Sequence, residues 1–183
     1  MFSIEKCPVP ANTTLEKYAT EGAYIDCYRT DVSGRVPIRE YISAFYTTPL
    51  FRLERFILRL VVSKPSTDIQ VRQLAEGDIQ RFAAWRVENR SENELLMCDF
   101  IGRTRSWLMA APVSTIDNIR TKLYFGSAIV PKRNLKTGAL SLGSGYQALI
   151  GFHQTYSVLL LYSAKLRIQH RIRSSYEKQD QFY

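Results

Sequence analysis

The sequence predicts an α+β fold in which a curved antiparallel sheet wraps around a long C-terminal helix, with two short helices after the first strand. Three observations support this. Segments with alternating apolar and polar residues fill residues 81–130 and are joined by short turns, which favours an antiparallel meander over parallel βαβ units. Two helical patterns precede them. Residues 146–173 then contain no proline and only Gly151 as an internal glycine, so a helix of up to about seven turns is allowed.

A length of 183 residues fits one domain. Hydrophobic residues make up 45% of the chain and charged residues 23%, which is the usual globular balance and excludes a disordered or collagen-like protein. We expect an N-terminal arm over residues 1–22, a folded core over residues 23–173 and a tail over residues 174–183.

The first strand is expected over residues 23–29, followed by a turn over residues 31–34. Pro37 stands where the first residue of a helix should be, since the N–H that proline lacks would be unpaired there in any case. Apolar residues follow at the i, i+3, i+4, i+7 spacing of a buried helix face: Ile38, Tyr41, Ile42 and Phe45.

A second helix follows the first directly. Thr47, Thr48 and Pro49 break the first helix and start the second, because threonine caps helices and proline is tolerated in the first turn. The second helix has an apolar stripe of Leu53, Phe56, Ile57 and Leu60. Its neighbouring face carries Arg52, Arg55 and Arg59, and such a stripe indicates a solvated face more often than an anion site. Residues 68–74 favour no single structure.

The remaining strands follow from period-two patterns and turn residues. Residues 81–89 alternate as one half-buried strand. Residues 94–100 and 104–112 form a hairpin around Gly102, since glycine supplies the positive φ that the turn needs. Residues 121–130 make the next strand, and a loop over residues 132–145 leads to the last helix.

The last helix carries a broad apolar face at three- and four-residue spacings. Its positions are Leu149, Phe152, His153, Tyr156, Leu159, Leu160 and Leu166. This face must cover a hydrophobic surface, and the sheet is the available partner.

Three parts of the sequence carry a resemblance to a known superfamily. They are the hairpin ELLMCD at 94–99 with RTRSWL at 103–108, the strand LYFGSA at 123–128, and HQTYS at 153–157. With the order of elements over residues 24–170, they resemble the helix-grip fold of the START and polyketide-cyclase (SRPBCC) superfamily, in a bacterial branch. The resemblance implies a cavity between the concave face of the sheet and the long helix, used for lipids, polyketides, plant hormones and other mostly apolar molecules. Some members are enzymes and many are carriers or sensors, so the fold leaves catalysis open.

His153 is the first candidate for chemistry, because it lies on the apolar side of the last helix near Tyr156 and Leu160. If it faces a cavity, an imidazole that titrates near neutral pH would suit a general acid or base, or a polar anchor for a ligand. The alternative is a buried histidine that is hydrogen-bonded to a backbone carbonyl or a tyrosine. We favour this alternative over catalysis and keep His153 as a pocket residue.

Side-chain alternation along the hairpin predicts that three charged residues lie on the same face as Trp107 and Met109. They are Asp99, Arg103 and Arg105. An arginine there could hold a carboxylate or enolate-like oxygen in an apolar pocket, with Asp99 orienting it. The commoner arrangement is a salt bridge near an exposed turn. The catalytic candidates are His153, Arg103 and Asp99, none of them committed, and whether the protein is an enzyme stays open.

Aromatic residues on the expected strands would supply apolar walls, although core packing explains them equally well. Tyrosine hydroxyls could contact a ligand. The ligand-binding candidates are Trp85, Arg103, Arg105, Trp107, Tyr124, His153 and Tyr156.

The formal net charge is +8, and 17 of the 25 basic residues are arginine, which raises the question of nucleic acid. The arginines are spread from Arg29 to Arg173 and no nucleic-acid-binding signature is present, so nucleic acid is not the partner that we expect. Two histidines, with no cysteine near either, argue against a metal site. The spacing of Gly138, Gly143 and Gly145 fits neither a P-loop nor a dinucleotide fingerprint, so no cofactor is expected.

Three cysteines at spacings of 20 and 71 residues fit no disulfide framework, which favours a reducing compartment. The first residues contain Glu5 and Lys6 and lack the apolar core of a secretory signal. The longest clearly apolar stretch, residues 158–162, is far shorter than the roughly 20 residues of a bilayer span. We expect a cytoplasmic protein without a membrane span, and a homo-oligomer stays open.

The sequence thus supports three hypotheses. The first is a binding protein for a small, mostly apolar molecule held between sheet and helix. The second is an enzyme of the cyclase, dehydratase or isomerase type that acts on an oxygenated apolar substrate through His153 and an arginine of the hairpin. The third is a basic interaction module for an acidic partner or nucleic acid.

Overall fold

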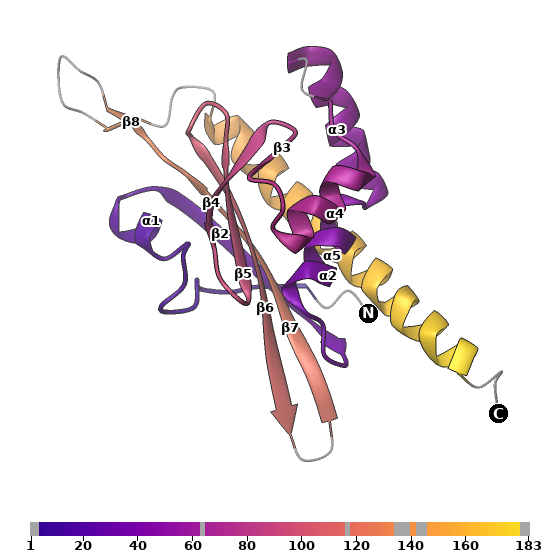
Figure 1. Cartoon of the computed structure of the whole chain (residues 1–183). Helices are drawn as coiled ribbons and strands as arrows, with labels where there is room; N and C mark the ends of the chain where they lie inside the picture. Colours follow the sequence, from indigo (N-terminus) through magenta and orange to yellow (C-terminus); the bar gives the residue numbers. More distant parts are fainter. Residues whose placement is uncertain (1–3, 63–64, 116–117, 134–139, 142–145, 180–183) are drawn as a thin grey trace.

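The structure is a computed structural model that describes residues 4–62, 65–115, 118–133, 140–141 and 146–179. Seven antiparallel strands form one open sheet in the order β1-β2-β7-β6-β5-β4-β3 (Figure 1). The strands are β1 (Glu5–Lys6), β2 (Tyr24–Ser33), β3 (Arg81–Phe82), β4 (Trp85–Arg90), β5 (Glu94–Asp99), β6 (Thr104–Thr115) and β7 (Asn118–Ile129). Two short strands, β8 (Lys132–Arg133) and β9 (Leu140–Ser141), pair separately.

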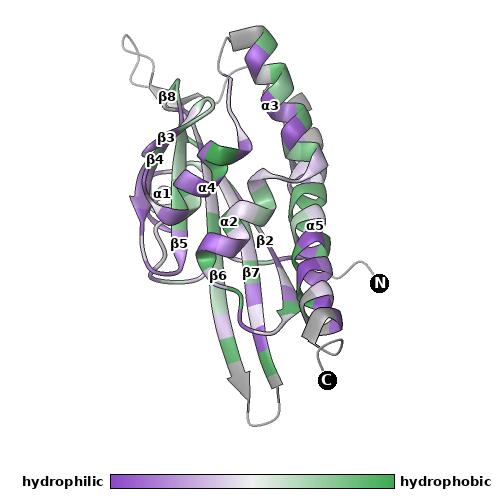
Figure 2. Ribbon diagram, turned by 45° about the vertical axis from the view of Figure 1, so that its right-hand side comes forward, coloured by the Kyte–Doolittle hydropathy of each residue, from purple (hydrophilic) through white to green (hydrophobic). Residues whose placement is uncertain are grey.

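Four of the five described helices gather on one side of this sheet, and the N-terminal arm with the remaining short helix lies on the other (Figures 1 and 2). The helices are α1 (Lys17–Thr20) in the arm, α2 (Ile38–Tyr46), α3 (Pro49–Val62), α4 (Asp68–Glu76) and α5 (Tyr146–Gln179). The antiparallel sheet and the long C-terminal helix confirm the expected α+β class, and their arrangement matches a helix-grip description. Helix α5 continues past Arg173 into the stretch that we expected to be a tail.

Each face of the sheet has its own hydrophobic core. The larger core joins the sheet to α2, α4 and α5 and includes Phe45, Leu74, Leu108, Phe125 and Leu161. The smaller core lies under the arm and includes Leu15, Tyr18, Trp107, Met109 and Tyr124. Side chains alternate between the two faces along a strand, so neighbouring residues of β6 and β7 belong to different cores.

The three helices between β2 and β3 begin where capping residues stand. Pro37 has an extended backbone and is the N-cap of α2, so the helix begins at Ile38, one residue later than expected. The hydroxyl of Thr48 accepts a hydrogen bond from the backbone N–H of Phe51 at 3.2 Å and so caps α3. Thr67 and Gln70 form a capping box on α4, the segment for which the sequence favoured no single structure.

The strand expected over residues 81–89 is wrong, because the chain turns back in the middle of it. Phe82 pairs with Trp85 across a two-residue turn, and Ala83 in that turn has a φ of 51°. Such a positive φ is uncommon for alanine, so the sequence carries no turn signal here. The turn places Phe82 and Trp85 on the same face, whereas uninterrupted alternation would place them on opposite faces.

The apolar stripe of α3 does not enter the core. Leu53, Phe56, Ile57 and Leu60 are 50% to 66% exposed, whereas Arg55 is only 8% exposed. The Arg55 guanidinium donates to Asp68 at 2.6 Å and to the Ser66 hydroxyl at 2.8 Å, which satisfies its charge at the start of α4. The interpretation of a solvated arginine face is therefore wrong for Arg55. Helix α3 stands clear of the sheet beside α5 (Figure 2). Its apolar side is partly exposed.

The apolar face of α5 also differs in part from the expected one. Leu160, Leu161, Ala164 and Ile168 are buried, whereas Leu159 and Leu166 are 42% and 47% exposed. The apolar side of the helix is wider than the strip that the sheet and α2 cover, so periodicity alone does not select the buried residues.

The arm approaches the sheet closely at Gly126. A Cβ atom at this position would lie 2.5 Å from Leu15 Cδ2 and 3.0 Å from Trp107 Cε3, so glycine is required for this contact. Nearby, the sulfurs of Cys7 and Cys27 lie 3.6 Å apart as free thiols. Both contacts hold residues of the arm against β2 and β7.

A candidate ligand cavity between the sheet and α5

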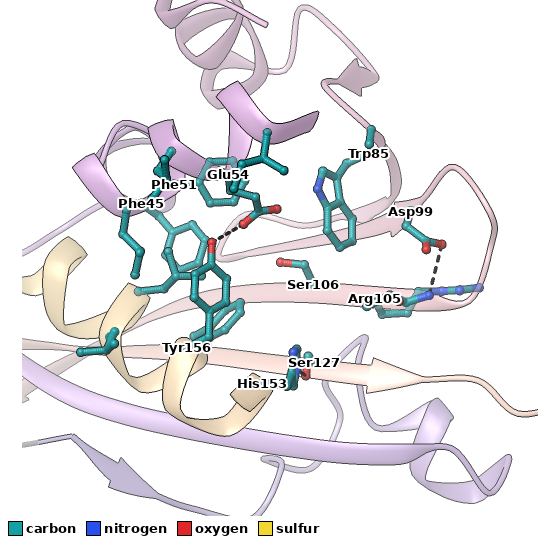
Figure 3. A pocket seen from close by; sticks show the side chains of 18 of the residues that line it. Phe45, Phe51, Glu54, Trp85, Asp99, Arg105, Ser106, Ser127, His153 and Tyr156 are labelled. Carbon is teal, nitrogen blue, oxygen red and sulfur yellow. Dashed lines mark hydrogen bonds between the residues drawn. The ribbon is translucent and has the colours of Figure 1, made fainter. Parts of the chain in front are cut away.

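A cavity of about 640 Å³ lies between the helix-bearing face of the sheet, α3 and α5 (Figure 3). Its walls are mostly apolar and include Phe45, Phe51, Phe125 and Leu160. Exposed apolar side chains lie among its lining at the solvent side: Leu53, Ile57, Phe100 and Leu159. The volume is in the range of small-molecule pockets.

Strand alternation decides which residues form the floor of this cavity. Ser106 of β6 and Ser127 of β7 share the face of their core neighbours Leu108 and Phe125 and line the cavity. With Thr104 of β6, which also lines the cavity, they place three hydroxyl groups on this side of the sheet.

The first polar group of the cavity is a chain of three side chains from three elements. Ser127 lies directly opposite Asp26 of β2, and its hydroxyl donates to Asp26 Oδ1. Its oxygen also lies 2.6 Å from His153 Nε2 on α5. The Asp26 side chain has no exposed surface, so it stands behind the two residues that face the cavity.

The single proton of the Ser127 hydroxyl determines the direction of the hydrogen bonds among these three side chains. A serine hydroxyl has one proton, and here it is given to Asp26. The Ser127 oxygen must then accept from His153, so Nε2 carries the proton in this arrangement. His153 Nε2 also lies 3.7 Å from Asp26 Oδ2, so it is close to both of the other side chains.

The second polar group is Glu54 of α3 with Tyr156 of α5, one helical turn after His153. The Tyr156 hydroxyl donates to Glu54 Oε2, as the dashed line in Figure 3 shows. Burial raises the pKa of the Glu54 carboxyl above its ordinary value of 4.5, and the hydrogen bond from Tyr156 opposes this shift in part. Burial and the neighbouring carboxyl also raise the pKa of Tyr156. This pair joins α3 to α5 across the cavity.

Glu54→Gln is expected to change how stability depends on pH. The raised pKa means that the folded protein holds the Glu54 proton more tightly than the unfolded chain does. This contribution is fully present below pH 4.5 and is lost as the pH rises through the raised pKa. Glutamine cannot ionise, so the free energy of unfolding of Glu54→Gln minus that of the wild type should increase with pH above 4.5. Urea unfolding at a series of pH values measures it.

Asp68→Asn provides the control for this experiment. The hydrogen bond from Arg55 holds the pKa of Asp68 below its ordinary value of 3.8, so its contribution is lost only as the pH falls through that lowered pKa. The free energy of unfolding of Asp68→Asn minus that of the wild type should therefore stay constant with pH above 4.5, where the same difference for Glu54→Gln rises. A flat difference for both variants would contradict a buried, proton-retaining Glu54.

The cavity includes some of the expected site residues. Trp85, His153 and Tyr156 line it, as proposed from the sequence. Asp99 and Arg105 lie at its edge, but each has a structural partner. Asp99 Oδ1 accepts the backbone N–H groups of residues 103 and 104 in the hairpin turn, and the Arg105 guanidinium lies 2.8 Å from both Glu88 and the Tyr18 hydroxyl.

The other expected residues lie outside the cavity. Trp107 and Tyr124 face the arm, because their parity along β6 and β7 is opposite to that of the floor residues. Arg103 donates to the backbone oxygen of Val130 at 3.4 Å and does not line the cavity. The expectation that Arg105 and Trp107 share a face is correct, but that face points toward the arm. The expectation is wrong for Asp99, which pairs with Trp85 and lies on the other face.

Three residues of the two polar groups described above were not among the candidates. Glu54 stands next to Leu53 in the stripe of α3, and a carboxyl within an amphipathic helix is ordinarily solvated. Ser127 and Asp26 are small polar residues within strands, and only the pairing of β2 with β7 brings them together. A buried position for Asp26 had one weak signal, its location between the apolar residues Ile25 and Cys27.

The described parts of the chain contain neither a metal site nor a membrane span. No group of three or more His, Cys, Asp or Glu side chains there could hold a metal ion. No described helix is both long enough and apolar enough to cross a membrane. Gly138, Gly143 and Gly145, whose spacing we considered for phosphate binding, lie outside the described residues.

Comparison of the chain with protein-family models, with curated proteins and with solved structures found no match. Membership of the START and polyketide-cyclase superfamily therefore stays a prediction from the sequence segments and the order of elements.

Proposed function

We propose that the protein binds a small, mostly apolar molecule in the cavity between the sheet and α5. The cavity itself is the observation that carries this proposal, because about 640 Å³ of mostly apolar space is large for a domain of this size. A cavity of this size loses packing contacts in the empty protein, and an apolar ligand restores them. The few polar groups on its wall would orient such a ligand.

A second candidate is acid–base catalysis on an oxygenated apolar substrate. The observation that favours it is the presence of two titratable groups on the same wall, His153 and the pair of Glu54 with Tyr156. Arg103, which we considered as a partner of His153, has no place in this version, because it does not line the cavity. The ligand-binding proposal requires no chemical step, so it comes first.

Native mass spectrometry of the purified protein tests the proposal together with a dye titration. We expect an extra mass that is lost on denaturation, and we expect Nile red, an uncharged apolar dye, to bind with a blue-shifted emission. Ser106→Phe adds a phenyl ring to the cavity floor and should weaken Nile red binding at least about tenfold, because the ring occupies the space of the ligand.

Ser33→Phe is the matched control, since it introduces the same ring at an exposed position of β2 that does not line the cavity. Leu160→Trp, on the opposite wall, repeats the test if Ser106→Phe does not fold. Nile red affinity that is equal in the wild type and in a folded cavity-filling variant would disprove the proposal.

A further inference from the structure

We propose that the exposed sides of α3 and α5 bind the surface of an anionic phospholipid membrane, with apolar side chains of both helices in the acyl layer and arginines at the headgroup phosphates. This inference depends on exposed apolar residues and on where the positive charge lies. It requires no ligand in the cavity, so it goes beyond the proposed function and is tested separately from it.

The apolar part of this surface belongs to two helices that lie side by side (Figures 1 and 2). The stripe of α3 is 50% to 66% exposed, and two leucines of α5 are 42% and 47% exposed. These six residues, the apolar face, are Leu53, Phe56, Ile57 and Leu60 of α3 and Leu159 and Leu166 of α5. Leu53, Ile57 and Leu159 also line the cavity, so the cavity opens at this face. Large exposed apolar side chains on neighbouring elements indicate an interaction surface.

The positive charge of the protein is concentrated on the same two helices. Helices α3 and α5 contain eight Lys and Arg residues and two acidic residues, which is +6 of the formal net charge of +8. Of the two acids, Glu54 accepts from Tyr156 beside the cavity, and Glu177 lies in the last turn of α5. Every described side chain of α3 that is exposed is either apolar or an arginine. Arg52 and Arg59 therefore flank the apolar face without an exposed acid of α3 between them.

A basic groove of about 490 Å³ lies where the start of α3 meets α5. Its lining residues are Pro49 of α3 and Ser163, Leu166, Arg167, His170 and Arg171 of α5. Burial lowers the pKa of Arg167, and the charges of Arg171 and Arg52 lower it further. The Asp68 carboxylate opposes this shift, but it is already paired with Arg52 and Arg55. A phosphate group in the groove would supply the negative charge that these arginines lack.

An anionic bilayer surface matches both parts of this surface at once. Apolar side chains of a helix that lies in the membrane interface enter the boundary between headgroups and acyl chains, and basic side chains beside them are attracted to anionic lipid. A nucleic acid would contact the arginines but leave the leucine and isoleucine side chains in water. A second copy of the chain that packed through the same surface would bring arginines against arginines.

Flotation of the purified protein with lipid vesicles in a sucrose gradient tests this inference at physiological ionic strength. One vesicle is phosphatidylcholine, and the other is an equimolar mixture of phosphatidylcholine and phosphatidylglycerol. The variants are Phe56→Asp and Leu60→Asp, which do not line the cavity, and Arg167→Gln in the groove. The matched controls are Ile119→Asp and Arg120→Gln, at exposed positions near the start of β7, away from α3 (Figure 1).

The wild type should float with the anionic vesicles and not with pure phosphatidylcholine. Phe56→Asp and Leu60→Asp should each lower the partition coefficient at least about tenfold, because a charge replaces a side chain that enters the acyl boundary. Arg167→Gln should lower it about fivefold. Both controls should stay within about twofold of the wild type, since their positions are screened from the membrane.

Three results overturn the membrane surface. They are no flotation with anionic vesicles, equal flotation with both kinds of vesicle, and equal losses in the controls and in the surface variants. A protein that does not float but forms a dimer that Phe56→Asp dissociates, as measured by sedimentation velocity, would assign the apolar face to a second copy of the chain.

Nile red titration without vesicles separates this inference from the proposed function. Phe56→Asp should bind the dye as the wild type does, because Phe56 does not line the cavity. Dye binding without flotation leaves the cavity proposal and removes the membrane surface. Flotation without dye binding does the reverse.

Discussion

Trp107→Ala is expected to lower the free energy of unfolding by about 3–5 kcal/mol. The indole is fully buried between the sheet and the arm, where Leu15 and Tyr124 pack around it. Its N–H also donates to Glu94, a buried carboxylate that accepts two further hydrogen bonds from the backbone and hydroxyl of Thr14. The substitution therefore opens a cavity and weakens the group that anchors the arm. Urea unfolding measures the loss.

Trp107→Phe separates these two effects. It keeps an aromatic ring but removes the donor to Glu94, so a loss of about 1–3 kcal/mol is expected. Nile red should bind Trp107→Phe as it binds the wild type, since the ligand cavity is on the other face of the sheet. A loss below about 1 kcal/mol for Trp107→Ala would contradict the account of the arm. Weakened Nile red binding by Trp107→Phe would return Trp107 to the ligand site.

The elements that sequence reasoning predicted well are those with local signals at both ends. Pro37 and Thr48 mark the starts of α2 and α3, and Gly102, with a φ of 79°, marks the turn between β5 and β6. The turn between β3 and β4 has no such signal. Alanine at a φ of 51° is held there by the pairing of the two strands, which local sequence does not encode.

Helix α3 shows a second limit of the sequence. Its periodicity correctly indicates an apolar face, but which neighbour covers that face depends on how α3 meets α5 and α4. Arg55 is buried because Ser66 and Asp68 lie beside it in the folded chain. Leu53 and Ile57 line the cavity, and the partial exposure of these apolar side chains would not be expected from an amphipathic pattern.

The candidate site was predictable where one element supplies it. His153 and Tyr156 share a face of α5, and their spacing already placed them together. Ser127 and Glu54 enter the cavity from other elements, and their partners are 101 and 102 residues away along the chain. The alternation of side chains along the strands does not indicate which face of the sheet borders the cavity, because both faces carry a hydrophobic core. For this reason the ligand-binding candidates include Trp107 and Tyr124, which lie on the face that the arm covers.

Ser127→Ala is expected to lower the free energy of unfolding by about 2–3 kcal/mol, far more than an average surface serine. Ser127 gives the buried Asp26 side chain its hydrogen bond, and no described residue donates a hydrogen bond to the second oxygen, Oδ2. Removing the hydroxyl leaves a carboxylate that has no exposed surface and whose Oδ2 lies 3.7 Å from His153 Nε2. Urea unfolding of the variant measures this cost, with Ser33→Ala as the exposed control.

The double variant Asp26→Asn/Ser127→Ala distinguishes a cost of charge burial from a cost of lost packing. An amide is less costly than a carboxylate to bury without a donor, so the second substitution should restore at least about 1 kcal/mol of the loss in Ser127→Ala. No recovery would mean that the hydroxyl acts through packing and that Asp26 does not depend on it. If the double variant regains stability but binds Nile red more weakly, Asp26 and Ser127 also contribute to ligand binding. They would do so by positioning His153, which contacts Ser127 and lines the cavity. A recovered fold with unchanged binding would assign the three side chains to the fold alone.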